Sequence, residues 1–186
     1  MKTLKILLTV VLALLAVIAI IYGYNGGFKK VLFREVEQGG EILVYQEFVG
    51  DYQQSGAKMD KVYSSLLNDY KIETYRGFGI YYDNPEKVEK SKLRSELGCI
   101  LESRDSSKIP VLEKNFKIKI CPKGNYLVTD FPFMGKLSIM IGIMKVYPAL
   151  TQHLKDNGYS QTGPIMEIYD TPNKKITYRT EIRKNE

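Results

Sequence analysis

The feature that most constrains the fold of this 186-residue chain is an internal duplication. The tetrapeptide YDNP at 82–85 recurs as YDTP at 169–172, a spacing of 87 residues, and Glu-Phe at 47–48 recurs as Asp-Phe at 130–131, a spacing of 83. Each matching pair stands at the same point in an order of strand, helix, strand, strand. A repeat of this kind indicates one supersecondary unit present twice.

Apolar patterning supplies the elements of each unit. Strands are expected at 30–34, 41–48, 78–82, 93–101, 126–133, 165–169 and 176–182. The first expected helix packs through Met59, Val62, Tyr63, Leu66, Leu67 and Tyr70. The second, 136–156, packs through Leu137, Met140, Ile141, Met144, Tyr147 and Leu150, and Pro148 predicts a kink or a break in it.

These elements predict an α+β fold, a tandem β-α-β-β repeat with pseudo-twofold symmetry. The two sheets should join at the symmetry axis, with both helices on one face. The other face should then carry a central groove, and grooves of that kind bind ligands.

The N-terminal segment differs from the rest of the chain. No charge occurs from residue 6 to residue 28, and residues 6–24 are long enough to cross a bilayer as one helix. A cleaved signal peptide is the alternative, because Lys2 and Lys5 precede the apolar run. We therefore divide the chain into a transmembrane anchor, 1–28, and one ligand-binding domain, 29–186. The expected location is a single-pass position in a bacterial inner membrane or the endoplasmic reticulum, with the sidedness open.

Alternation along the strands predicts which side chains face the groove. In the last strand Ile176, Tyr178, Thr180 and Ile182 form the more apolar set, so Thr177, Arg179 and Glu181 should lie on the open face. In 165–169 the apolar Met166 and Ile168 should face the helices. That assignment places Glu167 and Tyr169 in the groove.

The repeat extends the same assignment to Phe78, Ile80 and Tyr82 in the first half. An aromatic groove with carboxylates suits a flat, amphipathic or cationic molecule. The alternative is an ordinary solvated sheet face on which Arg179 pairs with Glu167 across strands.

Other chemistry is not indicated. The formal charge is +6, but basic and acidic residues alternate along the chain, so no nucleic-acid surface is expected. The two cysteines, Cys99 and Cys121, are expected to be isolated buried thiols, although a disulfide is not excluded. No glycine motif or histidine cluster implies a cofactor or a metal.

The groove strands also carry a family resemblance. Residues 163–169 (GPIMEIY) and 178–182 (YRTEI), preceded by 148–150 and 154–159, are similar to the carboxy-terminal half of GyrI-like effector-binding domains. The resemblance covers about residues 40–183. Residues 80–85 and 131–133 are closer still to a testis-expressed, single-pass endoplasmic-reticulum type of GyrI-like protein that serves as a receptor for autophagy of that organelle.

The resemblance implies a groove that takes up hydrophobic or cationic compounds, with a glutamate as charge partner; Glu181 matches best and Glu167 second. It favours a binding protein over an enzyme. Two alternatives stay open: a membrane-bound adaptor acting through protein partners, and a hydrolase of reactive electrophiles that uses Glu181 as base. The adaptor role lacks an acidic C-terminal tail, and the hydrolase role requires a buried carboxylate.

Overall fold

The computed structural model describes residues 2–185, so Met1 and Glu186, the ends of the two predicted domains, lie outside it. The helices are α1 (Lys2–Tyr24), α2 (Ser55–Asn68), α3 (Ile109–Leu112) and α4 (Lys136–Asn157), with short 3-10 turns at Tyr52–Gln54, Lys90–Lys92 and Ser103–Lys108. The strands are β1 (Arg34–Gln38), β2 (Ile42–Val49), β3 (Arg76–Tyr81), β4 (Arg94–Leu101), β5 (Lys117–Ile120), β6 (Gly124–Pro132), β7 (Tyr159–Gln161), β8 (Ile165–Asp170) and β9 (Lys175–Lys184).

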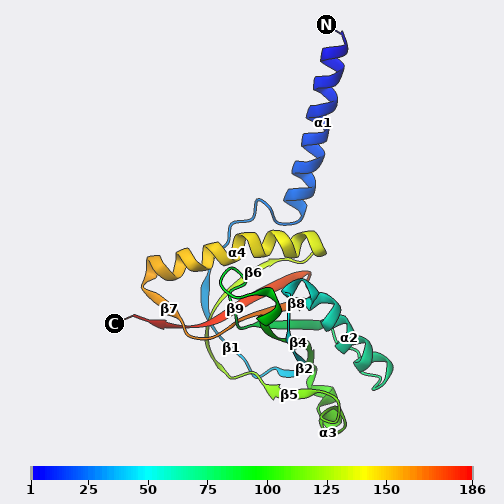
Figure 1. The fold of residues 1–186 in the computed structure, drawn as a ribbon, viewed down its shortest axis with the longest axis vertical. Coiled ribbons are helices and arrows are strands. Elements are labelled where there is room, and N and C mark those ends of the chain that lie inside the picture. The colour runs from blue at the N-terminus through cyan, green and yellow to red at the C-terminus, as the bar shows by residue number, and fades with distance from the viewer. Residues whose placement is uncertain (1, 186) are drawn as a thin grey trace.

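The sheet has the order β1-β6-β9-β8-β3-β4-β2-β5, with β7 paired to β9. β2-α2-β3-β4 and β6-α4-β8-β9 are the two copies of the repeated unit, and β3 pairs antiparallel with β8 where they meet. The counterparts of β1, β6, β9 and β8 are β5, β2, β4 and β3. The strand order counted from one edge of the sheet therefore matches the order counted from the other edge. The predicted α+β fold and its tandem β-α-β-β repeat are confirmed (Figure 1).

The two edge strands are exchanged between the halves. β1 precedes β2 but pairs with β6, whereas β5 precedes β6 but pairs with β2. The β1–β2 and β5–β6 connections therefore cross, and they bond where they meet: Gly40 N donates to Cys121 O at 2.7 Å, and Cys121 N donates to Glu41 O at 2.8 Å. Gly39 has a φ of 110°, and a Cβ there would lie 1.9 Å from the Pro122 carbonyl oxygen, so only glycine fits.

The predicted strand at 30–34 is wrong. Residues 30–33 are irregular, and the first strand begins at Arg34. Val31 and Phe33 are apolar because they pack into the cluster beneath α4, not because they belong to the sheet.

Helices α2 and α4 cover the same face of the sheet. Val62 and Leu66 of α2 pack with Val44, Cys99 and Leu101, and Ile141 and Val146 of α4 pack with Phe131, Tyr169, Ile176 and Tyr178. The opposite face is filled by its own side chains: Leu43, Tyr45, Phe78, Ile80, Ile100, Cys121, Met166 and Ile168 form a buried cluster. That face is a core, so the open groove predicted there is wrong.

The packed face of α4 differs from the predicted one. Its buried residues are Ser138, Ile141, Gly142, Val146 and Leu150, whereas Leu137, Met140 and Met144 point outward. The small Ser138 and Gly142 allow close approach to the sheet, and the helix is apolar on both sides. It also runs unbroken through Pro148, which lies on its exposed side.

One buried ion pair links the crossed connections to the sheet. The Arg179 guanidinium, only 1% exposed, donates to both carboxylate oxygens of Glu41 at 2.8 and 3.0 Å. Burial raises the pKa of Glu41, but the hydrogen bond and charge of Arg179 outweigh it and hold that pKa below its usual value. The pair joins β9 to the start of β2.

We expect Glu41→Ala to lower the free energy of unfolding by about 3 kcal/mol or more, because it leaves the Arg179 charge buried without a partner. Glu47→Ala is the matched control. Glu47 pairs with Lys117 and both are 58% exposed, so its loss should cost under about 1 kcal/mol. Urea denaturation measures both, and equal losses would contradict the assignment.

Candidate functional site

The candidate site is built around a carboxylate beneath α4. Glu167 lies in the middle of β8 on the helix-covered face and is only 2% exposed. The Tyr147 hydroxyl, from α4, donates to Oε1 at 2.7 Å, and the Tyr169 hydroxyl donates to Oε2. A helix and a strand therefore hold the two carboxylate oxygens from different directions.

No lysine or arginine within residues 2–185 forms an ion pair with Glu167, although other buried ionisable groups have one. Glu96 pairs with Lys119 on the opposite face, and Arg179 pairs with Glu41. Burial raises the pKa of Glu167 above its usual value, and the hydrogen bonds from Tyr169 and Tyr147 offset this only in part. The site therefore carries a carboxyl group with tyrosines in place of a cation.

Four tyrosines, which we call the tyrosine cage, surround this group: Tyr81, Tyr147, Tyr169 and Tyr178. Burial, reinforced by the nearby Glu167 charge, raises the pKa of all four. They come from β3, α4, β8 and β9, so both halves of the repeat contribute.

Two glycines make room for the tyrosine cage. Gly79 pairs with Glu167 across the β3–β8 ladder, and a Cβ on it would lie 2.6 Å from the Tyr81 hydroxyl. On α4, a Cβ at Gly142 would lie 2.6 Å from the Tyr178 hydroxyl. The Tyr178 hydroxyl is buried and has no hydrogen-bond partner among the described residues. Because buried polar groups nearly always have partners, an orphan hydroxyl beside a buried carboxyl group marks this place as a candidate site.

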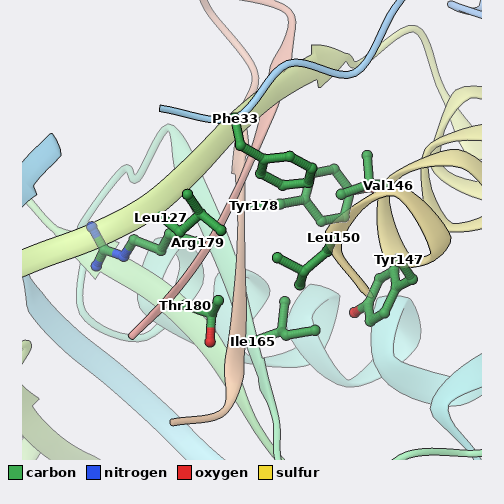
Figure 2. A pocket seen from close by; sticks show the side chains of 9 residues that line it. All are labelled: Phe33, Leu127, Val146, Tyr147, Leu150, Ile165, Tyr178, Arg179 and Thr180. Atoms are coloured by element: carbon green, nitrogen blue, oxygen red, sulfur yellow. The ribbon is translucent and has the colours of Figure 1, made fainter. Parts of the chain in front are cut away.

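A small cavity adjoins the cage between α4 and strands β6 and β9. Its volume is about 10 Å³, roughly the room of one water molecule. The lining residues are Phe33, Leu127, Val146, Tyr147, Leu150, Ile165, Tyr178, Arg179 and Thr180. Figure 2 shows the rings of Phe33 and Tyr178 near one another, Tyr147 on the α4 side, and the Arg179 side chain extending away from the others.

The predicted face of β8 is wrong. Glu167 and Tyr169 lie beneath α4, whereas Met166 and Ile168 lie in the core of the opposite face. The prediction failed because Met166 and Ile168 are the more apolar pair. Separately, the YDNP and YDTP match is offset by one residue from the structural repeat, and such an offset exchanges the two faces of a strand. The counterparts of Glu167 and Tyr169 are Gly79 and Tyr81, not Ile80 and Tyr82, and Gly79 is also opposite Glu167 in the ladder.

The residues predicted in the first half lie on the expected face. Phe78 and Ile80 are on the side away from the helices, but they are buried in its core, with 0% and 6% exposure. Tyr82 is exposed at the end of β3, where Arg94 stacks on its ring at 5.9 Å. The structure therefore does not bring these three residues together with Glu167 and Tyr169.

The assignment of β9 agrees with the structure: Arg179 is on the face away from the helices, and Tyr178 is beneath α4. Arg179 pairs with Glu41, so the alternative of a solvated sheet face on which Arg179 pairs with Glu167 is wrong. Glu181 is exposed near the end of the sheet. Of the two glutamates predicted in the groove, Glu167 is therefore the one that is buried. Binding roles for all these residues stay predictions.

Sequence reasoning missed Tyr81, Tyr147 and Tyr178 as site residues. What could have identified them in the sequence is that each tyrosine stands among apolar core positions, where a hydroxyl needs a polar partner, and Glu167 is such a partner. Cys99 and Cys121 are both free and buried, as expected. Within residues 2–185 no group of three or more histidine, cysteine or acidic side chains is placed to hold a metal ion.

Comparison with known proteins identifies the family. Residues 33–183 match the sequence profile described as the GyrI-like small molecule binding domain. The chain belongs to this family. The GyrI-like domain covers both repeat units, and it begins after α1.

Human testis-expressed protein 264 is 34% identical to this GyrI-like protein over 100 residues, which are 50% of this chain and 32% of the human protein. The matched region thus spans about a third of that relative's length. The DNA gyrase inhibitor of Yersinia enterocolitica is 27% identical over 139 residues, 74% of this chain and 85% of the inhibitor.

Two solved structures show the same fold. The C-terminal domain of EcmrR superposes with a TM-score of 0.57 at 14% identity, covering 83% of this chain and 99% of that domain. SAV2435 bound to tetraphenylphosphonium gives 0.54 at 7% identity, covering 83% of this chain and 94% of that chain. At such identities the similarity establishes the fold alone.

The raised pKa of Glu167 makes a prediction about stability and pH. As the pH rises, the unfolded chain releases this proton first, so the native state becomes less favourable between about pH 4.3 and the raised folded pKa. Glu167→Gln imitates the protonated group and removes this loss. We expect the melting temperature of E167Q relative to wild type to increase between about pH 4 and pH 8. For the exposed control, Glu181→Gln, the difference should stay constant; parallel curves for E167Q would refute the assignment.

Proposed function

We propose that this GyrI-like protein is a membrane-tethered receptor that binds a hydrophobic cation or cationic amphiphile between α4 and the sheet, at Glu167. The observation that carries this proposal is a carboxyl group, 2% exposed, held by tyrosine hydroxyls without a cationic partner. A cationic ligand would supply the missing partner.

The surroundings of Glu167 suit a delocalised cation. Aromatic ring faces attract cations most strongly when both are removed from water, and four tyrosines enclose the carboxyl group. A cation with its charge spread over several rings loses little hydration on entering such a site, whereas a metal ion or an ammonium loses much more. The unpaired Tyr178 hydroxyl provides one further polar contact for the ligand.

Binding requires the site to open. Drug-sized ligands occupy about 300–1,000 Å³, far more than the 10 Å³ present beside the cage. The parts that can separate are α4 and the irregular segment carrying Phe33, since both pack against the sheet through side chains alone in this region. We infer that ligand binding displaces α4 outward and breaks the Tyr147–Glu167 hydrogen bond.

Tetraphenylphosphonium is the probe of choice, because the structurally similar SAV2435 was solved bound to it. We expect the full chain in detergent to bind this cation, and Glu167→Gln to weaken binding by about tenfold or more, since a desolvated charge interaction contributes at least about 1.4 kcal/mol. Isothermal titration calorimetry measures both affinities.

Two controls separate charge from shape. Glu181→Gln removes an exposed carboxylate and should leave the affinity unchanged, and tetraphenylborate has the same shape with the opposite charge and should bind far more weakly to the wild type. Equal binding of the two ions, or equal loss in E167Q and E181Q, would reject the Glu167 site.

The tether is α1. It is the one helix among the described residues long and apolar enough to cross a membrane, with mean hydropathy 3.0, and none of its residues is buried in the protein. A signal sequence would share these properties. An uncleaved anchor is supported by the contacts that Gly26 and Gly27, just after α1, make with Phe131 and Lys145 of the folded domain.

We expect the full chain expressed in cells to stay in the membrane pellet after alkaline carbonate extraction, and its intact mass to include α1. Recovery of a soluble product that has lost the first two dozen residues would show a cleaved signal and end the anchor proposal. Deleting residues 2–24 is the control, and it should release the domain into the soluble fraction.

A further inference from the structure

The outer surface of α4 is unusually apolar for a helix that covers a sheet. Leu137, Met140, Ile143 and Met144, which we call the outward stripe, are 43%, 60%, 44% and 73% exposed. Phe28 and Leu32 in the preceding linker are 70% and 74% exposed. Apolar surface this concentrated marks a contact with a partner or a membrane.

The linker fixes the end of α1 against α4 and β6. Lys145 of α4 donates a hydrogen bond to the Gly27 carbonyl, and the Gly26 Cα packs so closely on the Phe131 ring that a Cβ would lie 2.8 Å from it. Asn25 is buried, and its side-chain amide donates to the Ile21 carbonyl at 2.8 Å, at the end of α1. Helix α1 is therefore attached directly to the domain, not through a flexible linker.

Figure 1 shows the consequence for orientation: α4 runs across the domain end of α1, and the sheet lies on the other side of α4. If α1 follows the bilayer normal, α4 lies nearly parallel to the bilayer plane. The outward stripe is solvent-exposed surface of this helix, so a bilayer that surrounds α1 would lie next to α4 and its exposed side chains.

Charge beside Phe28 and Leu32 fits the same lipid boundary. A shallow groove of about 450 Å³ between the linker and α4 is lined by Phe28, Lys29, Lys30, Val31, Leu32, Lys145 and Ala149. Apolar side chains beside several lysines match the boundary between acyl chains and anionic headgroups. Among the residues that line this groove there is no acidic side chain to oppose such binding.

We propose that the outward stripe of α4, with Phe28 and Leu32, is embedded in the interfacial region of the bilayer that α1 spans. The proposal rests on the proposed anchor. Tyr147, which holds Glu167, follows Met144 by one helical turn, so lipid contact and the binding site would involve neighbouring residues of the same helix.

Tryptophan fluorescence tests this directly, because the chain contains no tryptophan. The full chain is reconstituted in vesicles of phosphatidylcholine and phosphatidylglycerol, with or without brominated acyl chains, which quench tryptophan on contact. Met140→Trp is the test variant. Val111→Trp is the control, since Val111 is also exposed, at 42%, but lies on α3 at the end of the domain away from α1. We expect quenching of M140W by brominated lipid to exceed that of V111W by about threefold or more.

Leu12→Trp, in the middle of α1, reports insertion independently. Quenching of L12W and M140W together supports both proposals. Quenching of L12W with M140W no stronger than V111W overturns the interfacial position of α4 and leaves the anchor in place. An unquenched L12W overturns the anchor and the inference that rests on it. Melting curves of the three variants check the fold, which substitutions at exposed positions should leave intact.

Discussion

A carboxyl group held beneath a helix without a positive charge is the constraint around which the second half of this protein is organised. An unpaired carboxylate in an apolar interior is costly, and two tyrosine hydroxyls reduce that cost without abolishing it. Tyr147 has to come from α4 and Tyr169 from β8, so the hydrogen bonds fix the helix over the strand. Gly142 and Gly79 provide the space that the large rings need.

The duplicated architecture places this group at the junction of the two halves. Glu167 and its counterpart Gly79 face one another across the central ladder, so one copy supplies the charge and the other leaves room for it. In the same way β9 carries Tyr178 opposite Glu167, whereas the matching position on β4 is Leu97, opposite Gly79. The fold is nearly symmetric, but its chemistry belongs to one half.

Much of the fold follows from the sequence, whereas the site follows only in part. The order of elements, the repeat and the faces of β9 are legible because they reflect apolar spacing. The face of β8 is not, because Met166 and Ile168 are the more apolar pair and yet pack on the side away from the helices. Local patterning fails at the strand that places a polar group, Glu167, in the interior, and such failures are expected at candidate sites. The packed face of α4 was predicted wrongly for a related reason. This helix is apolar on both sides, so periodicity alone could not identify the buried side.

The exchange of β1 and β5 has a consequence for how the two halves depend on each other. Each half obtains its outermost strand from the other, so neither can complete its sheet alone. A single β-α-β-β unit with its leading strand would leave that strand unpaired and an edge exposed, and it could satisfy both only by trading strands with a second copy. During synthesis the sheet of the first half is therefore incomplete until residues 117–120 have emerged, and β1 has no partner until β6 follows. Folding of this domain is in effect the intramolecular assembly of a strand-swapped dimer.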